Sequence, residues 1–346
     1  MKRLLSKALA SALFILGPLT AIGQSGEDRE LFAQSSTTSK YAMILTGATV
    51  GQENEAKFRQ LSLSLHDILA RDYGYSAAGI ELLLSETNTD SRADGISDRD
   101  GIIASLGRLS EKLKTGDQLA VFLLGHGTGV DDEAKFNLRG PDLTGVEFAR
   151  LFDGFAEQDL IFVNTTSASY GFSTALAREV AGEGRIVVSA TRSSSEKFDP
   201  YFPRYFIEGL ADKRADRDKN SRVSLLEAFT YAKNNVEEFY EESGRLAAEH
   251  AALDDNGDAL FTLAPAPGQS DGSLAEIAFI DAADADDDTL PAERLALKRR
   301  MQALERSVLL LRGRKAEYLE GDYWLQLETL LVDLAKTTEQ FNVQAP

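Results

Sequence analysis

The sequence contains no cysteine among its 346 residues. This absence excludes disulfide bonds, cysteine-ligated zinc, lipid attachment through an N-terminal cysteine and a thiol nucleophile. Positive charge is also scarce, because 37 lysines and arginines face 55 aspartates and glutamates, which gives a net charge of −18. Nucleic acids and anionic membrane surfaces repel such a protein. We therefore expect neither of them as a partner.

Long apolar runs are lacking as well, and outside the N-terminal segment none reaches about 18 residues, the length that a membrane helix needs. At the N-terminus, basic residues precede an apolar stretch from Ala8 to Ile22, and the small residues Ala21 and Gly23 fit a cleavage site. This pattern predicts a secretory signal peptide over residues 1–23. Because Pro18 breaks the stretch, we expect cleavage rather than anchoring, and a periplasmic or secreted protein that does not span a membrane.

Strand and helix patterns alternate over residues 40–280, after a polar segment at 24–39 that we expect to be a flexible lead. Helical spacing is found at 53–73 and at 98–113. Short continuous apolar runs, typical of buried strands, lie at 41–46, 79–84, 118–124, 160–163 and 185–189. This alternation predicts an α/β fold with a mostly parallel sheet covered by helices on both faces. Ligands of such sheets bind at the carboxyl ends of the strands.

The C-terminal part reads as an appendage to this domain. Leu274–Ile280 predicts an edge strand, and the acidic residues 281–290 predict a linker. Residues 291–343 predict a helical hairpin or coiled-coil-like segment, although one long interrupted helix fits equally well. The spacing that indicates this is carried by Leu297, Met301, Leu304, Val308 and Leu311. Such a stripe serves either packing on the main domain or a helical partner, which includes self-association.

Two segments carry candidate chemistry, and both follow predicted strands. The third strand ends with His126 between Gly125 and Gly127, where glycines let the backbone approach a ligand and leave the Gly127 N–H free to point into a cleft. The fourth strand continues into residues 165–169, which read TTSAS and open a helix. Small hydroxyl residues at such a position supply a nucleophile or simply cap the helix.

Together these segments resemble the caspase–legumain (clan CD) cysteine peptidases. In that family a His-Gly pair ends one strand, and the catalytic cysteine follows the next. Without gaps, His126 matches the catalytic histidine, and Ser167 stands where the cysteine belongs. The N–H groups of Gly127 and Ser167 match the oxyanion donors. A shift of register would place Thr166 or Ser169 at the nucleophile position.

The resemblance covers residues 40–280 and implies a caspase–hemoglobinase-like three-layer fold. It also implies that Thr191, Arg192 and Ser193, which follow the fifth strand, correspond to the segment that lines the S1 substrate pocket in the legumain branch. The positive charge of Arg192 would favour an acidic side chain in that pocket.

The serine is the departure from the family. A thiol supplies some thiolate near neutral pH, whereas a hydroxyl needs a base in direct contact that a third group orients. No acidic residue adjoins His126 in the sequence. We therefore expect an inactive pseudo-peptidase that binds peptide or scaffolds a protein complex. The alternative is an active endopeptidase of the same fold that uses Ser167 with His126.

A second alternative is a serine esterase of the α/β-hydrolase type. Residues 167–171 nearly fit the G-x-S-x-G motif, His250 lies downstream, and Asp216 or Asp218 falls between them. Against it, His250 lies in a predicted helix at 246–253. The glycine turn after the first strand lacks the G-x-G-x-x-G spacing of a nucleotide loop, so no organic cofactor is expected.

Residues 216–227 fit the calcium-binding loop of an EF-hand. Its six liganding positions are occupied by Asp216, Asp218, Asn220, Arg222, Ser224 and Glu227. Arg222 is permitted because its position binds through the backbone carbonyl. Ser221 stands where a glycine makes the sharp turn, at a cost of about 1–2 kcal/mol. Calcium is thus the one cofactor expected, the alternative being a calcium-free connector between helices.

Overall fold

The computed structural model describes residues 29–34, 38–48, 51–86, 90–180, 183–281 and 290–343. The chain divides into two units, residues 1–30 and 31–346. The expected signal peptide lies outside the described residues, as does most of the expected acidic linker. Among the described residues, no helix is long and apolar enough to cross a membrane.

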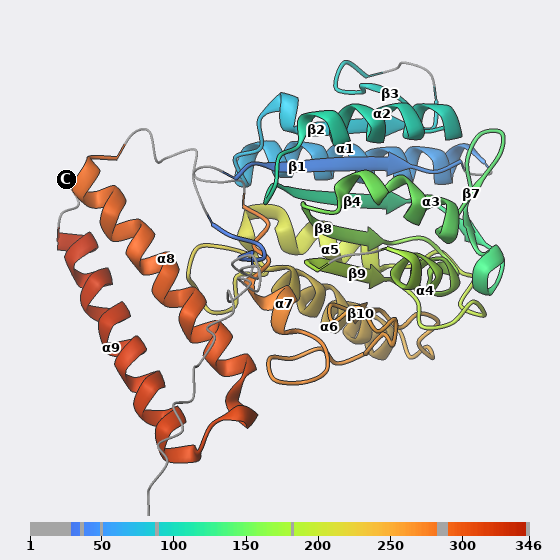
Figure 1. The fold of residues 1–346 in the computed structure, drawn as a ribbon. Helices are drawn as coiled ribbons and strands as arrows, with labels where there is room; N and C mark the ends of the chain where they lie inside the picture. The colour runs from blue at the N-terminus through green and yellow to red at the C-terminus, as the bar shows by residue number, and fades with distance from the viewer. Residues whose placement is uncertain are drawn as a thin grey trace, which may run out of the picture. The chain divides into compact units, whose positions relative to one another are not determined.

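A seven-stranded sheet organises the second unit, in the order β10-β9-β8-β4-β1-β2-β3. Every strand pair in it is parallel except β10 with β9. In Figure 1 the arrows of β1, β4, β8 and β9 point the same way. The strands are β1 (Lys40–Thr46), β2 (Ile80–Leu84), β3 (Gly95–Ile96), β4 (Gln118–Leu124), β8 (Asp159–Asn164), β9 (Arg185–Ser189) and β10 (Ala252–Asp254). The predicted α/β fold with a mostly parallel sheet is confirmed.

Helices connect these strands, and a small antiparallel sheet of β5 (Gly127–Thr128), β6 (Lys135–Phe136) and β7 (Leu143–Thr144) follows β4. The helices are α1 (Gln52–Asp72), α2 (Arg99–Lys112), α3 (Gly145–Leu151), α4 (Ser169–Glu179), α5 (Phe202–Leu210), α6 (Leu225–Glu242), α7 (Ser273–Ile277), α8 (Ala292–Gly313) and α9 (Glu320–Val343). The C-terminal segment is therefore a helical hairpin, one of the two arrangements that the sequence allowed (Figure 1).

The two faces of the sheet carry separate apolar cores. Alternate residues of each strand point to opposite faces, so in β1 Ile44 packs on one side and Leu45 on the other. One face is covered by α1, α5 and α6, through residues such as Phe58. The other is covered by α2, α3 and α4, where five phenylalanines gather around β8. They are Phe148, Phe152, Phe155, Phe162 and Phe172. Both cores hold the carboxyl ends of β4 and β8 in place.

Two sequence-based predictions of secondary structure are wrong. Leu274–Ile280 is not an edge strand, because residues 273–277 form α7. The Asp255 carboxylate accepts the N–H groups of Gly272 and Ala275 and so stabilises the start of that helix. Likewise, residues 246–253 are not a helix: residues 246–251 have no regular secondary structure and lead into β10, which is the edge strand beside β9.

The expected flexible lead contains a residue of the core. Phe32 is buried, and its N–H donates to the Asp159 carboxylate at 2.6 Å. The guanidinium of Arg306, from α8, donates to the carbonyl oxygens of Leu31 and Phe32. A single aromatic residue in a polar segment carries no periodicity, so the sequence pattern could not reveal this contact.

Candidate functional site

His126 lies just beyond the carboxyl end of β4. Gly125 before it has a φ of 147°, and a Cβ atom on Gly127 would lie only 2.6 Å from the carbonyl oxygen of Ser167. Only glycine permits this close approach of the two backbones. Gly127 thus brings the end of β4 against the turn that follows β8, while Gly125 packs against the backbone of Gly47 after β1.

Ser167 lies in that turn, between β8 and α4, and is buried. Ala168 adopts the left-handed conformation with a φ of 48°, and its N–H donates to the carbonyl oxygen of Glu196 at 2.9 Å. Asn164 accepts hydrogen bonds from the backbone N–H and the hydroxyl of Thr166. The turn is therefore fixed by the strand before it and by the loop that follows β9.

The structure brings His126 and Ser167 together, because β4 and β8 are neighbouring parallel strands. The Ser167 Oγ lies 3.5 Å from the His126 Nδ1. The Gly127 N–H points at the same oxygen, with a nitrogen–oxygen distance of 3.4 Å. Both contacts are at the long end of hydrogen-bond range. The three residues that the resemblance implied for the catalytic site thus meet at one point.

Asp199 is a member of the site that the sequence reasoning missed. Its Oδ1 lies 2.9 Å from the His126 Nδ1, and its Oδ2 lies 3.6 Å from the Nζ of Lys57. Phe58 contacts the imidazole edge-on, with ring centroids 5.3 Å apart. Asp199 lies in the loop that follows β9, at the same edge of the sheet as His126 and Ser167. The rule that ligands bind at the carboxyl ends of parallel strands points to this loop. It does not indicate which of the acidic residues in the loop faces the histidine.

The two other candidates for the nucleophile position face elsewhere. The Thr166 hydroxyl bonds to Asn164, and the Ser169 hydroxyl lies 2.9 Å from that of Ser189. Within the described part of the chain, Ser167 is the hydroxyl residue in contact with His126. Of the three hydroxyl residues named for this position, Ser167 is therefore the one that lies beside His126.

The three residues expected to line the S1 pocket have different environments. Thr191 is fully buried, and its hydroxyl accepts the N–H of Tyr170 at 3.1 Å. Arg192 has half of its side chain exposed, and its Nε lies 3.6 Å from the Glu196 carboxylate. Ser193 is partly exposed, with its hydroxyl on that of a neighbouring serine. Of the three, Arg192 and Ser193 are accessible to a ligand, while Thr191 holds the loop against α4.

His250, the histidine of the esterase alternative, belongs to another contact. Its Nδ1 lies 2.6 Å from the Glu196 Oε1, and its backbone N–H donates to the same carboxylate. Ser169 bonds to Ser189 and Thr191 instead. Across the described residues, no hydrogen bond or ion pair joins His250 to a serine or threonine hydroxyl of the 165–169 turn.

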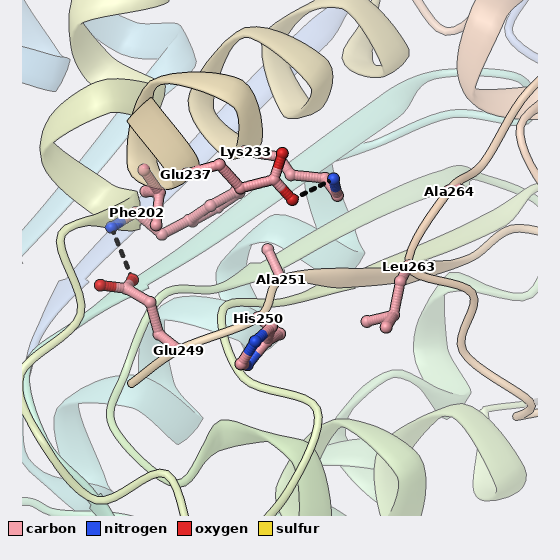
Figure 2. A pocket seen from close by; sticks show the side chains of 9 residues that line it. Phe202, Lys233, Glu237, Glu249, His250, Ala251, Leu263 and Ala264 are labelled. Atoms are coloured by element: carbon pink, nitrogen blue, oxygen red, sulfur yellow. Dashed lines mark hydrogen bonds and ion pairs between the residues drawn. The ribbon is translucent and has the colours of Figure 1, made fainter. Parts of the chain in front are cut away.

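A mostly apolar cavity of about 220 Å³ lies beside His250 (Figure 2). The buried Glu249 at its edge accepts the N–H groups of Tyr201 and Phe202, which begin α5, and the hydroxyl of Tyr240. Burial raises the pKa of Glu249 in spite of these hydrogen bonds. Because these donors fill its carboxylate, Glu249 acts here as a helix cap.

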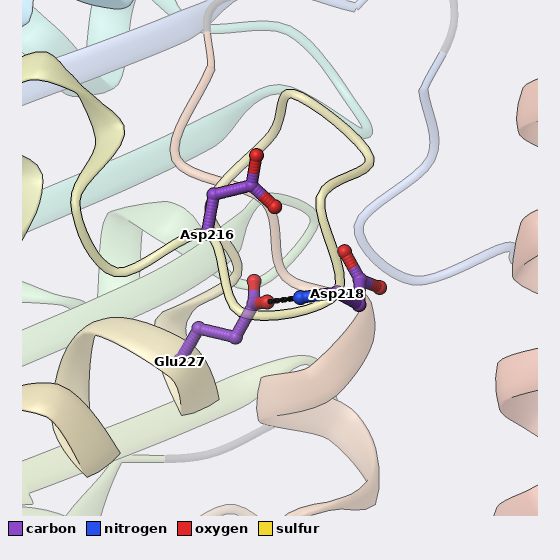
Figure 3. Close-up of side chains that lie close together, drawn as sticks. All are labelled: Asp216, Asp218 and Glu227. Carbon is purple, nitrogen blue, oxygen red and sulfur yellow. Dashed lines mark hydrogen bonds between the residues drawn. The ribbon is translucent and has the colours of Figure 1, made fainter.

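The EF-hand-like loop brings part of its predicted ligand set together. Oxygen atoms of Asp216, Asp218 and Glu227 lie within 4.8 Å of one another and could hold a metal ion (Figure 3). The loop bends through Ser221, which adopts a φ of 66°, the left-handed conformation that the sequence required there. Figure 3 also shows the Asp218 N–H directed at the Glu227 carboxylate.

The other three predicted ligands have different contacts. The Asn220 side chain accepts the N–H of Arg222, and the Arg222 guanidinium lies over the ring of Phe279 at 3.7 Å. Ser224 caps α6 in a reciprocal pair with Glu227. Three carboxylates therefore converge, and those of Asp216 and Glu227 accept hydrogen bonds from N–H groups of the same loop.

Negative charge accumulates around these carboxylates. Burial, together with the Asp216 carboxylate, raises the pKa of Asp218, and burial raises that of Glu227. Glu276 of α7 faces the same region, and burial with the charges of Asp218 and Glu227 raises its pKa to about 7. This occurs although Arg312 of α8 lies 3.0 Å from Glu276. A bound cation would relieve this repulsion.

No protein-family model matches the chain, and no curated protein matches it. The function must therefore be argued from the geometry of these residues.

Proposed function

We propose that this chain is an exported protein of the caspase–legumain peptidase fold whose site at His126, Gly127 and Ser167 binds peptide with little or no hydrolysis. The observation that carries the proposal is the meeting of Ser167 Oγ and His126 Nδ1 at 3.5 Å, at the carboxyl ends of adjacent parallel strands. This is the relation between histidine and nucleophile positions that the resemblance implies. The Gly127 N–H, which points at the Ser167 Oγ, also supports the proposal.

Weak catalysis follows from the same distances. A serine attacks a peptide bond only when a base removes its proton through a direct hydrogen bond. The contact with His126 is at the limit of that range, and the Ser167 Oγ is also 3.4 Å from the Gly127 carbonyl oxygen, which can accept its proton. The hydroxyl is thus not placed as an activated nucleophile.

The active endopeptidase remains the second candidate, and one observation favours it. Asp199 supplies the carboxylate beside His126 that the local sequence lacks. A serine hydrolase needs such a group to orient its histidine. The esterase alternative has less support, because His250 is paired with Glu196.

Peptide-library binding and cleavage by the mature chain test the proposal. We expect peptides to be retained uncut by the wild type and by Ser167→Ala alike, since binding does not need the hydroxyl. His126→Ala should weaken retention several-fold, because the partly exposed imidazole lies at the site. Leu246→Ala, at a side chain that is 94% exposed, is the control and should change nothing. Cleavage that both site variants abolish would establish the endopeptidase instead.

We also propose that Asp216, Asp218 and Glu227 bind calcium. With an affinity of about 0.1–1 mM, typical of extracellular modules, about 10 mM calcium should raise the free energy of unfolding by about 1.4–2.7 kcal/mol. Thermal unfolding with calcium, with magnesium and with a chelator measures this. Asp218→Asn should remove the effect, while Asp258→Asn, in a separate acidic turn, should retain it. Equal stability with calcium and with chelator would contradict the proposal.

A further inference from the structure

We propose that Asp199 is a positioning residue that keeps a proton on the Nδ1 of His126 and thereby withholds this nitrogen from Ser167 as a base. This proposal rests on the proposed function in one respect, which is that His126 and Ser167 form the site. It assigns to Asp199 the opposite effect from that of an activating carboxylate. It also gives a physical reason for a peptidase-like site that does not cut.

The geometry places two groups on one ring nitrogen. The Asp199 Oδ1 is 2.9 Å from Nδ1, and the Ser167 Oγ is 3.5 Å from the same atom. This contact is an ion-pair distance, and the negative charge of the carboxylate favours a proton on the ring nitrogen beside it over a bare lone pair there. A ring nitrogen that carries a proton has no lone pair to accept another. While Asp199 stays in place, Ser167 cannot pass its proton to this nitrogen.

This arrangement differs from a serine–histidine–aspartate triad in one decisive respect. In a triad the carboxylate binds one imidazole nitrogen and the serine hydroxyl binds the other, so the carboxylate strengthens the base. Here the carboxylate and the hydroxyl compete for the same nitrogen, and the carboxylate has the shorter contact. The same three residue types therefore keep His126 from acting as a base toward Ser167, whereas in a triad they make the histidine a stronger base.

Asp199 and the ring are held by several neighbours. Lys57 lies 3.6 Å from the second carboxylate oxygen of Asp199, and Phe58 supports the imidazole edge-on. The loop that carries Asp199 is anchored at Glu196. The Glu196 carbonyl oxygen accepts the Ala168 N–H, and its carboxylate binds His250. The contact is thus part of a connected set between β4, β8 and β10.

Nitrogen-15 NMR of the histidine side chains tests where the proton lies. The sequence has three histidines, so His126→Gln identifies the signals of His126. We expect the wild type to carry the proton on Nδ1 at neutral pH, and Asp199→Ala to shift it toward Nε2. Glu133→Gln, which removes an equal charge from the exposed loop after β5, should leave the signals unchanged. A wild-type ring with bare Nδ1, or one insensitive to Asp199→Ala, would overturn the proposal.

Reaction with a fluorophosphonate probe gives the second readout. Labelling forms a bond between Ser167 Oγ and phosphorus, breaks the phosphorus–fluorine bond and sends the serine proton to His126 Nδ1. We expect Asp199→Ala to label at least about ten times faster than the wild type, and His126→Gln in that background to remove the gain. If Asp199→Ala is labelled no faster than the wild type, Asp199 does not withhold the Nδ1 of His126 from Ser167. Peptide binding could fail in a separate assay without altering either result, so the two proposals fail independently.

Discussion

Ser167→Cys should cleave peptides that the wild-type protein leaves intact. A cysteine ionises with a pKa of about 8.5, so part of it is thiolate near neutral pH without a base in direct contact. The long contact between residue 167 and His126, which disables a hydroxyl, is therefore tolerable for a thiol. We expect the turnover of library peptides to rise by about 10²-fold or more, a gain within the range of nucleophile and acid–base effects.

The dependence on His126 gives this experiment its control. In the proposed site, His126 would act as acid to the leaving group, so His126→Ala in the Ser167→Cys background should lower the rate by about 10²–10⁴. Ser169→Cys places the same thiol two residues away, where the side chain contacts Ser189, and should stay silent. If Ser167→Cys is also silent while it still binds peptide, the catalytic geometry is absent and the resemblance is limited to the fold.

Phe162→Ala should lower the free energy of unfolding by about 3–5 kcal/mol. Phe162 is fully buried in β8 and stacks on Phe172, with ring centroids 5.9 Å apart. Phe148 and Phe152 also contact its ring. Removing the ring leaves a cavity between the sheet and its covering helices, which rigid neighbours cannot fill. Urea denaturation followed by circular dichroism measures the loss.

Phe198→Ala is the matched control, because it deletes the same ring from a side chain that is 76% exposed. It should change the free energy of unfolding by less than about 0.5 kcal/mol. Since β8 leads directly into the turn with Ser167, Phe162→Ala should also weaken peptide binding at temperatures where the protein is still folded. A loss of stability below about 1 kcal/mol would mean that the aromatic cluster repacks around the gap.

The main domain could be predicted from the sequence because its central strands β4, β8 and β9 are fully buried. The apolar runs 119–124 and 186–188 lie within β4 and β9. The rule that ligands meet the carboxyl ends of parallel strands then directed attention to His126 and Ser167, which the structure brings together. His126 and Ser167 lie close together because they follow β4 and β8, which are neighbouring parallel strands.

Contacts between distant loops were beyond the reach of sequence patterns. Asp199 meets His126 because of the path of one loop, and acidic residues are too common in this chain to single it out. Leu274–Ile280 has the composition of a strand, yet the distant carboxylate of Asp255 favours a helix there. In each case the deciding partner lies many residues away and leaves no local periodicity.

The hydrogen bonds of Arg306 to the carbonyl oxygens of Leu31 and Phe32 also constrain the order in which the protein is completed. They join residues 274 and 275 positions apart in the chain. During synthesis from the N-terminus, residues 31 and 32 emerge long before Arg306. The hydrogen bonds that hold the backbone beside Phe32 can thus form only after residue 306 has been synthesised. Such long-range closure is slow compared with the formation of local helices.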